Sequence, residues 1–127
     1  MVNKRIIHTQ EAPNAIGPYS QAVLMGNVLF TSGQLGVNPQ AGKLEEGVEA
    51  QAHAAMRNVG SILKAAGVGY ENIIKTTIFL KDLGDFQTVN QVYASYFSSD
   101  FPARSCVQVA ALPLGGLVEI ECVATIG

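Results

Sequence analysis

This 127-residue chain has a formal net charge of −2, and 48% of its residues are hydrophobic whereas only 14% are charged. Its length fits one domain over residues 1–127, and its eight Lys and Arg residues are scattered along the chain, which argues against binding to nucleic acid or to an anionic membrane. An average soluble domain has about 25% charged residues, so we expect a homo-oligomer that buries apolar surface between subunits. No apolar run is long enough to span a membrane and the start lacks the pattern of a signal peptide, so we expect a cytoplasmic protein.

The first half of the chain predicts a strand, a β-hairpin and a long helix. The strand covers residues 4–9, and the hairpin covers residues 22–32 with its turn at Gly26-Asn27. Apolar residues recur at helical spacing over 45–66, acidic residues occupy the first turn, and Gly67 ends the helix. This helix has the pattern of a packing element and not of a site.

The loops around the hairpin provide three candidate ligand-binding groups. Gly17-Pro18 predicts a turn that holds Tyr19 on an ordered loop, where it serves either as a lid with a phenolic donor or as cover for the edge of the core. At the end of the hairpin, Ser32 supplies a hydroxyl group, and the N–H group of Gly33 is open to close approach because glycine has no Cβ. The alternative is that Ser32 and Gly33 only end a strand and begin a turn.

The second half of the chain predicts a strand, a helix and a second hairpin. The β-branched strand over 73–80 is expected to be central in the sheet. Asp85 is expected to cap a helix with an aromatic side, on which Asn90 is either a surface residue or a ligand contact. Two β-prone runs, 104–111 and 117–125, flank a Pro/Gly loop, which predicts an antiparallel hairpin.

Alternation along this hairpin predicts which side chains share a face, since the slipped register would bury two glutamates. The core face is expected to hold Val107, Val109, Val118, Ile120 and Cys122. The opposite face is expected to hold Arg104, Gln108, Glu119 and Glu121. Two helices on one face of a mixed six-stranded sheet make an α+β fold, so this opposite face is left for neighbouring subunits, with pockets where they meet. An Arg104–Glu119 ion pair that only fixes the subunit interface fits the residues equally well.

Neither the cysteines nor the histidines predict a metal or redox site. Cys106 and Cys122 lack the usual ligand spacing, and the predicted hairpin places them on opposite faces, where they cannot form a disulfide. His8 and His53 have no neighbouring ligands at metal spacing apart from Glu49, which lies one helical turn before His53. We therefore expect no metal.

Several motifs together resemble the RidA family, the YjgF-type reactive intermediate deaminases that are also labelled L-PSP endoribonucleases. They run in order through nearly the whole chain: Gly17-Pro-Tyr-Ser-Gln-Ala22, Thr31-Ser-Gly-Gln34, Ala65-Ala-Gly67, Lys75-Thr-Thr77, Lys81-Asp-Leu-x-Asp-Phe86, Val89-Asn90, Pro102-Ala-Arg-Ser-Cys-Val-Gln-Val-Ala-Ala-Leu112 and Val118-Glu-Ile120. The sequence departs from this pattern at Gly36, where some members carry proline, and in the uncharged loop 113–116. Both departures lie in loops, so they bear on substrate preference more than on chemistry.

The resemblance implies a chorismate-mutase-like protomer in a homotrimeric barrel, with the helices outside and three clefts between subunits. It implies hydrolysis of reactive enamines and imines, such as 2-aminoacrylate and 2-iminobutanoate, to a 2-oxo acid and ammonia without a cofactor. Dehydratases that depend on pyridoxal phosphate release these intermediates. Carried over residue by residue, Arg104 matches the carboxylate-binding arginine and Glu119 the glutamate near the reacting water. The other cleft-lining positions match Tyr19, Ser32, Gly33, Asn90 and Cys106.

The residues suit that chemistry. The planar fork of Arg104 fits a carboxylate, and Glu119 is expected to orient or deprotonate the attacking water while Ser32 or the N–H of Gly33 steadies the substrate. Cys106 has no histidine partner, so we interpret it as cleft wall and not as a nucleophile. Two alternatives remain: a non-catalytic binder of 2-oxo acids that uses the same cleft, and a translation-inhibiting endoribonuclease, against which the acidic charge argues.

Overall fold

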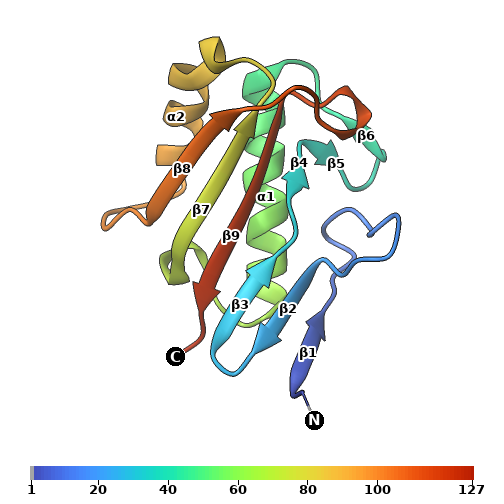
Figure 1. Cartoon of the computed structure of the whole chain (residues 1–127), viewed down its shortest axis with the longest axis vertical. Helices are drawn as coiled ribbons and strands as arrows, with labels where there is room; N and C mark the ends of the chain where they lie inside the picture. The colour runs from blue at the N-terminus through green and yellow to red at the C-terminus, as the bar shows by residue number, and fades with distance from the viewer. Residues whose placement is uncertain (1) are drawn as a thin grey trace.

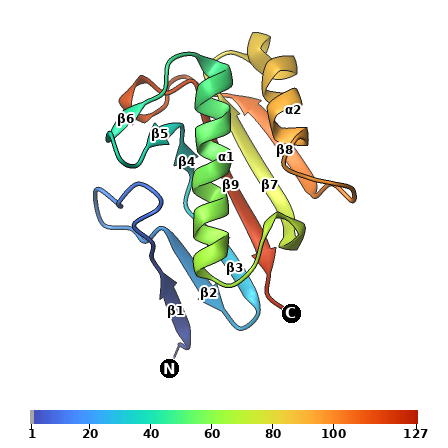
Figure 2. The same cartoon turned by 180° about the vertical axis from the view of Figure 1, so that it is seen from behind.

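The computed structural model describes residues 2–127. The chain folds into one large mixed sheet with two helices on one face (Figure 1). From behind, both helices lie over the same side of the sheet (Figure 2). The strand order is β1-β2-β3-β9-β7-β8, and the short strand β4 also pairs with β9. The predicted α+β class is confirmed, but the sheet has seven strands and not six because β4 joins it.

The first half of the chain forms short strands. They are β1 (Lys4–Ile7), β2 (Ala22–Met25), β3 (Val28–Thr31), β4 (Gln34–Leu35), β5 (Val37–Asn38) and β6 (Lys43–Leu44). The predicted hairpin is confirmed: β2 pairs antiparallel with β3, and Gly26 adopts the positive φ of 62° that the tight turn requires. Strands β5 and β6 form a separate two-stranded sheet.

The long helix α1 (Val48–Ala65) begins three residues later than predicted and ends before Gly67, whose φ is 84°. Its buried face packs against the sheet and holds the centre of the core. Gly36 lies so close to this helix that a Cβ there would overlap the backbone of Gln51. This close approach accounts for a glycine at position 36, where the sequence departs from the family pattern.

Strand β7 (Ile73–Leu80) is central, as predicted, since it lies between β9 and β8. Helix α2 (Phe86–Ala94) follows the 3₁₀ turn η2 (Leu83–Asp85). Asp85 stands at the N-cap position, as predicted. Its side chain, however, does not make the capping hydrogen bond that the sequence predicted. The upstream Asp82 carboxylate accepts a hydrogen bond from the Gly84 N–H group instead, because the chain already turns there.

The last two strands, β8 (Ala103–Gln108) and β9 (Val118–Thr125), do not form the predicted hairpin. Strand β7 lies between them, parallel to β8 and antiparallel to β9. The physical reason is that α2 separates β7 from β8, and a strand-helix-strand crossover brings the second strand back parallel to the first. The Pro/Gly loop after β8 then crosses the end of β7, where Lys81 N–H bonds to the Leu117 carbonyl group.

This topology reverses the predicted faces of β8. Arg104 and Cys106 pair in register with Thr76 and Ile78 and therefore face the helices, while Val107 is 44% exposed on the open face. The prediction for β9 is confirmed, because Val118, Ile120 and Cys122 are buried and Glu119 and Glu121 are not. Arg104 and Glu119 consequently lie on opposite faces of the sheet, and the shared face predicted for them is wrong.

The two cysteines were expected on opposite faces of the sheet, but both face the helices. Strand β7 separates them, and both are free thiols.

The open face of the sheet carries exposed apolar side chains, among them Phe30 at 52% and Val107 at 44%. Over residues 2–127, no helix is both long enough and apolar enough to cross a membrane.

Candidate functional site

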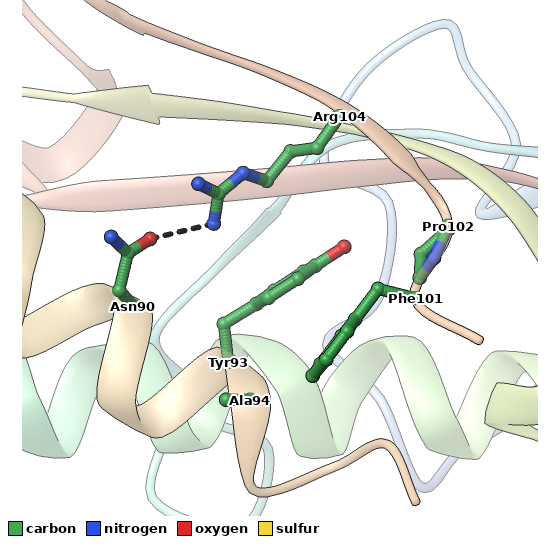
Figure 3. A pocket seen from close by; sticks show the side chains of 6 residues that line it. All are labelled: Asn90, Tyr93, Ala94, Phe101, Pro102 and Arg104. Atoms are coloured by element: carbon green, nitrogen blue, oxygen red, sulfur yellow. Dashed lines mark hydrogen bonds between the residues drawn. The ribbon is translucent and has the colours of Figure 1, made fainter. Parts of the chain in front are cut away.

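Arg104 forms the centre of a first half-site, between the start of β8 and helix α2. One guanidinium N–H group donates a 2.6 Å hydrogen bond to Oδ1 of Asn90, as Figure 3 shows. The guanidinium carbon lies 5.1 Å from the ring centroid of Tyr93 and 5.4 Å from that of Phe86. Asn90, which the sequence left open between surface residue and ligand contact, is therefore a direct partner of Arg104.

A cavity of about 340 Å³ opens beside Arg104 (Figure 3). It is lined by Asn90, Tyr93, Ala94, Phe101, Pro102 and Arg104. These side chains provide one cation, an amide and apolar walls, which suit a small carboxylate with a short apolar tail. Among the described residues that line this cavity none is acidic, so it holds no general base of its own.

Glu119 belongs to a second half-site on the other face of the sheet, in a cavity of about 610 Å³. The cavity is lined by Pro13, Asn14, Ile16, Tyr19, Gly33, Gln34, Leu35, Val37, Pro39, Gly42, Pro113, Leu114 and Glu119. Burial raises the pKa of the Glu119 carboxyl group, and the nearby Glu121 carboxylate raises it further. A raised pKa makes the carboxylate a stronger base toward a bound water molecule.

Gly33 is packed directly against Glu119. A Cβ atom at position 33 would lie 2.7 Å from Cδ and 2.9 Å from Cγ of Glu119, which is closer than real Cβ atoms approach. Glycine at this position therefore allows the Glu119 side chain to lie along the backbone of the loop after β3. The contact joins residues that are far apart in the sequence, and alternation along β9 alone does not predict it.

We expect Gly33→Ala to displace the Glu119 carboxylate and lower kcat/KM by roughly tenfold to a hundredfold, because small misplacements of a reacting group are costly. Steady-state kinetics of the reaction that the family resemblance implies, together with thermal melting, would measure this. Gly84→Ala is the matched control, since the atoms nearest to its Cβ would belong to the exposed Asp82 carboxylate, the first of them at 3.1 Å. Wild-type kinetics in Gly33→Ala would show that the working enzyme does not depend on this contact.

Ser32 contributes to this half-site indirectly. Its hydroxyl group donates a 2.6 Å hydrogen bond to the Ser20 carbonyl group, and its N–H group donates to the Gln21 carbonyl group. Ser32 thus ties the loop that carries Tyr19 to the end of β3, and it is not among the residues that line the cavity. Tyr19 itself lines the cavity, with an exposed side chain whose hydroxyl oxygen accepts a 3.4 Å hydrogen bond from the Ile16 N–H group.

Three buried amide side chains fasten backbone in the walls of the second cavity or next to them, and sequence reasoning did not assign them a role. Gln21, only 2% exposed, bonds through its amide to backbone groups of Thr9, Ala12 and Pro13. Asn58 donates to the carbonyl groups of Leu35 and Val37. Gln51 accepts from the Leu117 N–H group and donates to the Glu45 carbonyl group. For Gln51 and Asn58, the only signal in the sequence was a polar residue at a helix position whose spacing predicts burial.

Cys106 lies two residues after Arg104 on the same face of β8, partly buried against the core, and it lines neither cavity. Burial raises the pKa of its thiol group, and the Arg104 charge offsets part of that rise. The thiol is therefore protonated at neutral pH and is a poor nucleophile.

We expect Cys106→Ala to keep the turnover number within about threefold of the wild type, because the imine hydrolysis that the family resemblance implies needs no covalent intermediate. Steady-state kinetics of the purified variant would check this. A Ser variant is the companion measurement, since it restores a small polar side chain of similar size. Loss of most of the turnover in both variants would instead assign a chemical role to the thiol group.

Each half-site holds what the other lacks. The first has a fixed cation and no base, and the second has a half-buried carboxylate, but none of the described residues that line it is a Lys or Arg. The structure brings Arg104 together with Asn90, and Glu119 together with Gly33 and Tyr19, but it does not bring the two groups together within one chain.

Comparisons with known proteins place the chain in a family. The family described as Endoribonuclease L-PSP matches residues 9–126. The chain is 53% identical over 125 residues to the 2-iminobutanoate/2-iminopropanoate deaminase of Homo sapiens, covering 98% of this chain and 91% of that protein. It is 52% identical over 126 residues to the chloroplastic Reactive Intermediate Deaminase A of Arabidopsis thaliana, with 98% and 67% covered.

Solved structures agree with these sequence matches. The structure of E. coli TdcF with bound serine matches with a TM-score of 0.94 at 48% identity, covering 97% of this chain and 99% of that one. RidA from the Antarctic bacterium Psychrobacter sp. matches with a TM-score of 0.94 at 46% identity, covering 96% and 99%. The chain therefore belongs to the RidA family, also described as Endoribonuclease L-PSP.

Proposed function

We propose that this protein hydrolyses reactive enamine and imine intermediates, such as 2-aminoacrylate and 2-iminobutanoate, to 2-oxo acids and ammonia. The relatives named as deaminases support this activity, since they match over nearly the whole chain. The observation that carries the proposal is the pair of complementary half-sites, a fixed guanidinium on one face of the sheet and a desolvated carboxylate on the other. Dehydratases that depend on pyridoxal phosphate would supply such substrates.

The complete cleft, in this proposal, forms between subunits of a chorismate-mutase-like homotrimer. Arg104 and Asn90 of one subunit would face Glu119, Gly33 and Tyr19 of the next. Two points support this arrangement: the half-sites lie on opposite faces of one chain, and the open sheet face exposes apolar side chains that need cover. A contact between two different surfaces of the same chain generates a closed ring when the rotation closes, and three subunits then give three equal clefts.

In this cleft, Arg104 would bind the substrate carboxylate through its planar fork and place the C=N carbon near Glu119. Glu119 would accept a proton from water as the water oxygen bonds to that carbon. Glu119 would pass this proton to the imine nitrogen, which gives the carbinolamine. It would then carry the proton of the carbinolamine hydroxyl group to the same nitrogen, so that the C–N bond breaks, ammonia leaves and the C=O bond forms. The raised pKa of Glu119 suits a group that takes and returns a proton in one cycle.

A trapping assay tests this function directly. A threonine dehydratase converts threonine to 2-iminobutanoate, and semicarbazide captures the imine that remains. We expect the wild-type chain to lower the amount of captured imine and to speed the formation of 2-oxobutanoate above the rate in buffer. No effect on the imine, combined with binding of 2-oxobutanoate, would favour a non-catalytic sensor. No effect on the imine, combined with salt-sensitive RNA binding, would favour an endoribonuclease.

A further inference from the structure

The environment of Arg104 is unusual because aromatic rings stand where a counter-ion is expected. A carboxylate is the geometric match for a guanidinium group, and charged side chains withdrawn from water are commonly paired. Over residues 2–127 the structure has one ion pair, between Lys64 and Glu11, and no carboxylate is paired with Arg104. Its neighbours are the Asn90 amide and the rings of Phe86 and Tyr93.

These three neighbours form one stripe along α2. Phe86, Asn90 and Tyr93 are spaced at i, i+4 and i+7, so they lie on the same side of the helix and all reach the same guanidinium group. Both ring centroids are within the roughly 6 Å at which a cation is attracted to an aromatic face. The stripe therefore stabilises the charge of Arg104 without neutralising it.

The ring of Tyr93 is held in place by a buried hydrogen bond at its hydroxyl end. The residue is 4% exposed, and its hydroxyl group shares a 2.8 Å hydrogen bond with the hydroxyl group of Thr76, which is 1% exposed. Thr76 is also the register partner of Arg104 in the β7–β8 pair. Arg104, Tyr93 and Thr76 thus form a closed triangle that joins two strands and a helix, and the ring beside the guanidinium has little freedom to move.

Aromatic contact leaves the donors of Arg104 available. A guanidinium group has five N–H donors, and an aromatic ring attracts the cation without the strongly accepting oxygens of a carboxylate, so it competes weakly for those donors. A carboxylate in the place of the rings would occupy those donors and compete with any acidic ligand. Asn90 occupies one N–H group, and the remaining edge can still bind a ligand carboxylate.

We infer that Phe86 and Tyr93 form an aromatic clamp that takes the place of a counter-ion and presents Arg104 for binding of the substrate carboxylate. Both are positioning residues, because they act through Arg104. The inference rests on the proposed role of Arg104 in binding a carboxylate. It predicts that loss of the clamp weakens ligand binding and raises KM, while kcat changes little.

The first test measures the affinity for 2-oxobutanoate by calorimetry and KM by the trapping assay. Phe86→Leu is expected to lower the affinity and to raise KM, each by roughly threefold to thirtyfold, while kcat stays nearly constant. This range corresponds to the free energy of a partly desolvated cation–π contact. Phe97→Leu is the matched control. The ring centroid of Phe97 lies 4.9 Å from that of Tyr93, but the Phe97 ring is not one of the two that contact Arg104. Equal effects of the two substitutions, or a loss confined to kcat, would overturn the clamp.

The second test does not depend on deamination. In Arg104→Ala the rings remain without their cation, and we expect the variant to bind added ethylguanidinium in a calorimetric titration. The double variant Arg104→Ala with Phe86→Leu is expected to bind it at least threefold more weakly. Equal binding by both variants would refute the clamp. A chain that neither hydrolyses imines nor binds 2-oxobutanoate, yet shows this difference, would refute the proposed function and keep the clamp.

Discussion

Arg104→Ala is expected to reduce kcat/KM for 2-iminobutanoate by roughly a hundredfold to ten-thousandfold, because it removes two charge-assisted hydrogen bonds worth about 1.5–3 kcal/mol each. Most of the loss should appear in KM and in the affinity for 2-oxobutanoate, because Arg104 binds the part of the substrate that does not react. Arg104→Lys should recover part of it, since lysine keeps the charge but not the planar fork. The trapping assay and calorimetry measure both quantities.

The fold should survive this substitution, because Arg104 is only half-buried and its one hydrogen-bond partner, Asn90, is near the surface. Thermal melting would verify this. Arg57→Ala is the matched control, since Arg57 is an exposed arginine on α1 that lines neither half-site. Full activity in Arg104→Ala, with the control unchanged, would mean that the carboxylate binds elsewhere and would remove the basis of the proposed cleft.

Mixing two inactive variants is expected to restore activity. Glu119→Gln should lose roughly a hundredfold or more in kcat, the usual contribution of a general base. In the proposed trimer, Arg104→Ala and Glu119→Gln chains that are co-expressed with different tags and purified through both tags would give one cleft with both native residues in each mixed trimer. Such trimers would show about one third of wild-type activity, because a closed ring would pair unlike surfaces of neighbouring chains.

The appropriate negative control co-expresses Arg104→Ala with the double variant Arg104→Ala/Glu119→Gln. That mixture contains no native Arg104, so it should stay inactive although the same assembly forms. Mixed trimers that remain as inactive as the parent variants would place Arg104 and Glu119 in unrelated sites. Analytical ultracentrifugation of the same samples checks that trimers are present, so a negative result cannot arise from lack of assembly.

Local sequence pattern predicted the secondary structure well but not the pairing of β8. Strand β9 alternates clearly between buried apolar residues and glutamates, so its two faces were correct. Strand β8 carries Val107 on one face and Arg104 and Cys106 on the other, and Val107 was assigned to the core. At the edge of the sheet, however, the aromatic side chains of α2 cover the arginine, and Val107 stays exposed.

The candidate site shows the same division between local and long-range information. Motifs named Arg104, Glu119, Gly33, Tyr19 and Asn90, and the structure places each of them in one of the two half-sites. The contact of Gly33 with Glu119 and the triangle around Tyr93 join residues that only the folded chain brings together. They depend on strand register, which a hydrophobic pattern constrains within a strand but not between distant strands.

The amide side chains of Gln21, Gln51 and Asn58 have a consequence for the thermodynamics of ligand binding. They hold loop backbone around the Glu119 cavity by hydrogen bonds that are already formed in the free chain. The conformational entropy of these loops is therefore lost during folding and not when a ligand arrives. A molecule with only a carboxylate, a C=N group and a few carbon atoms offers little binding energy, so a rigid, preformed wall lets that small energy appear as affinity.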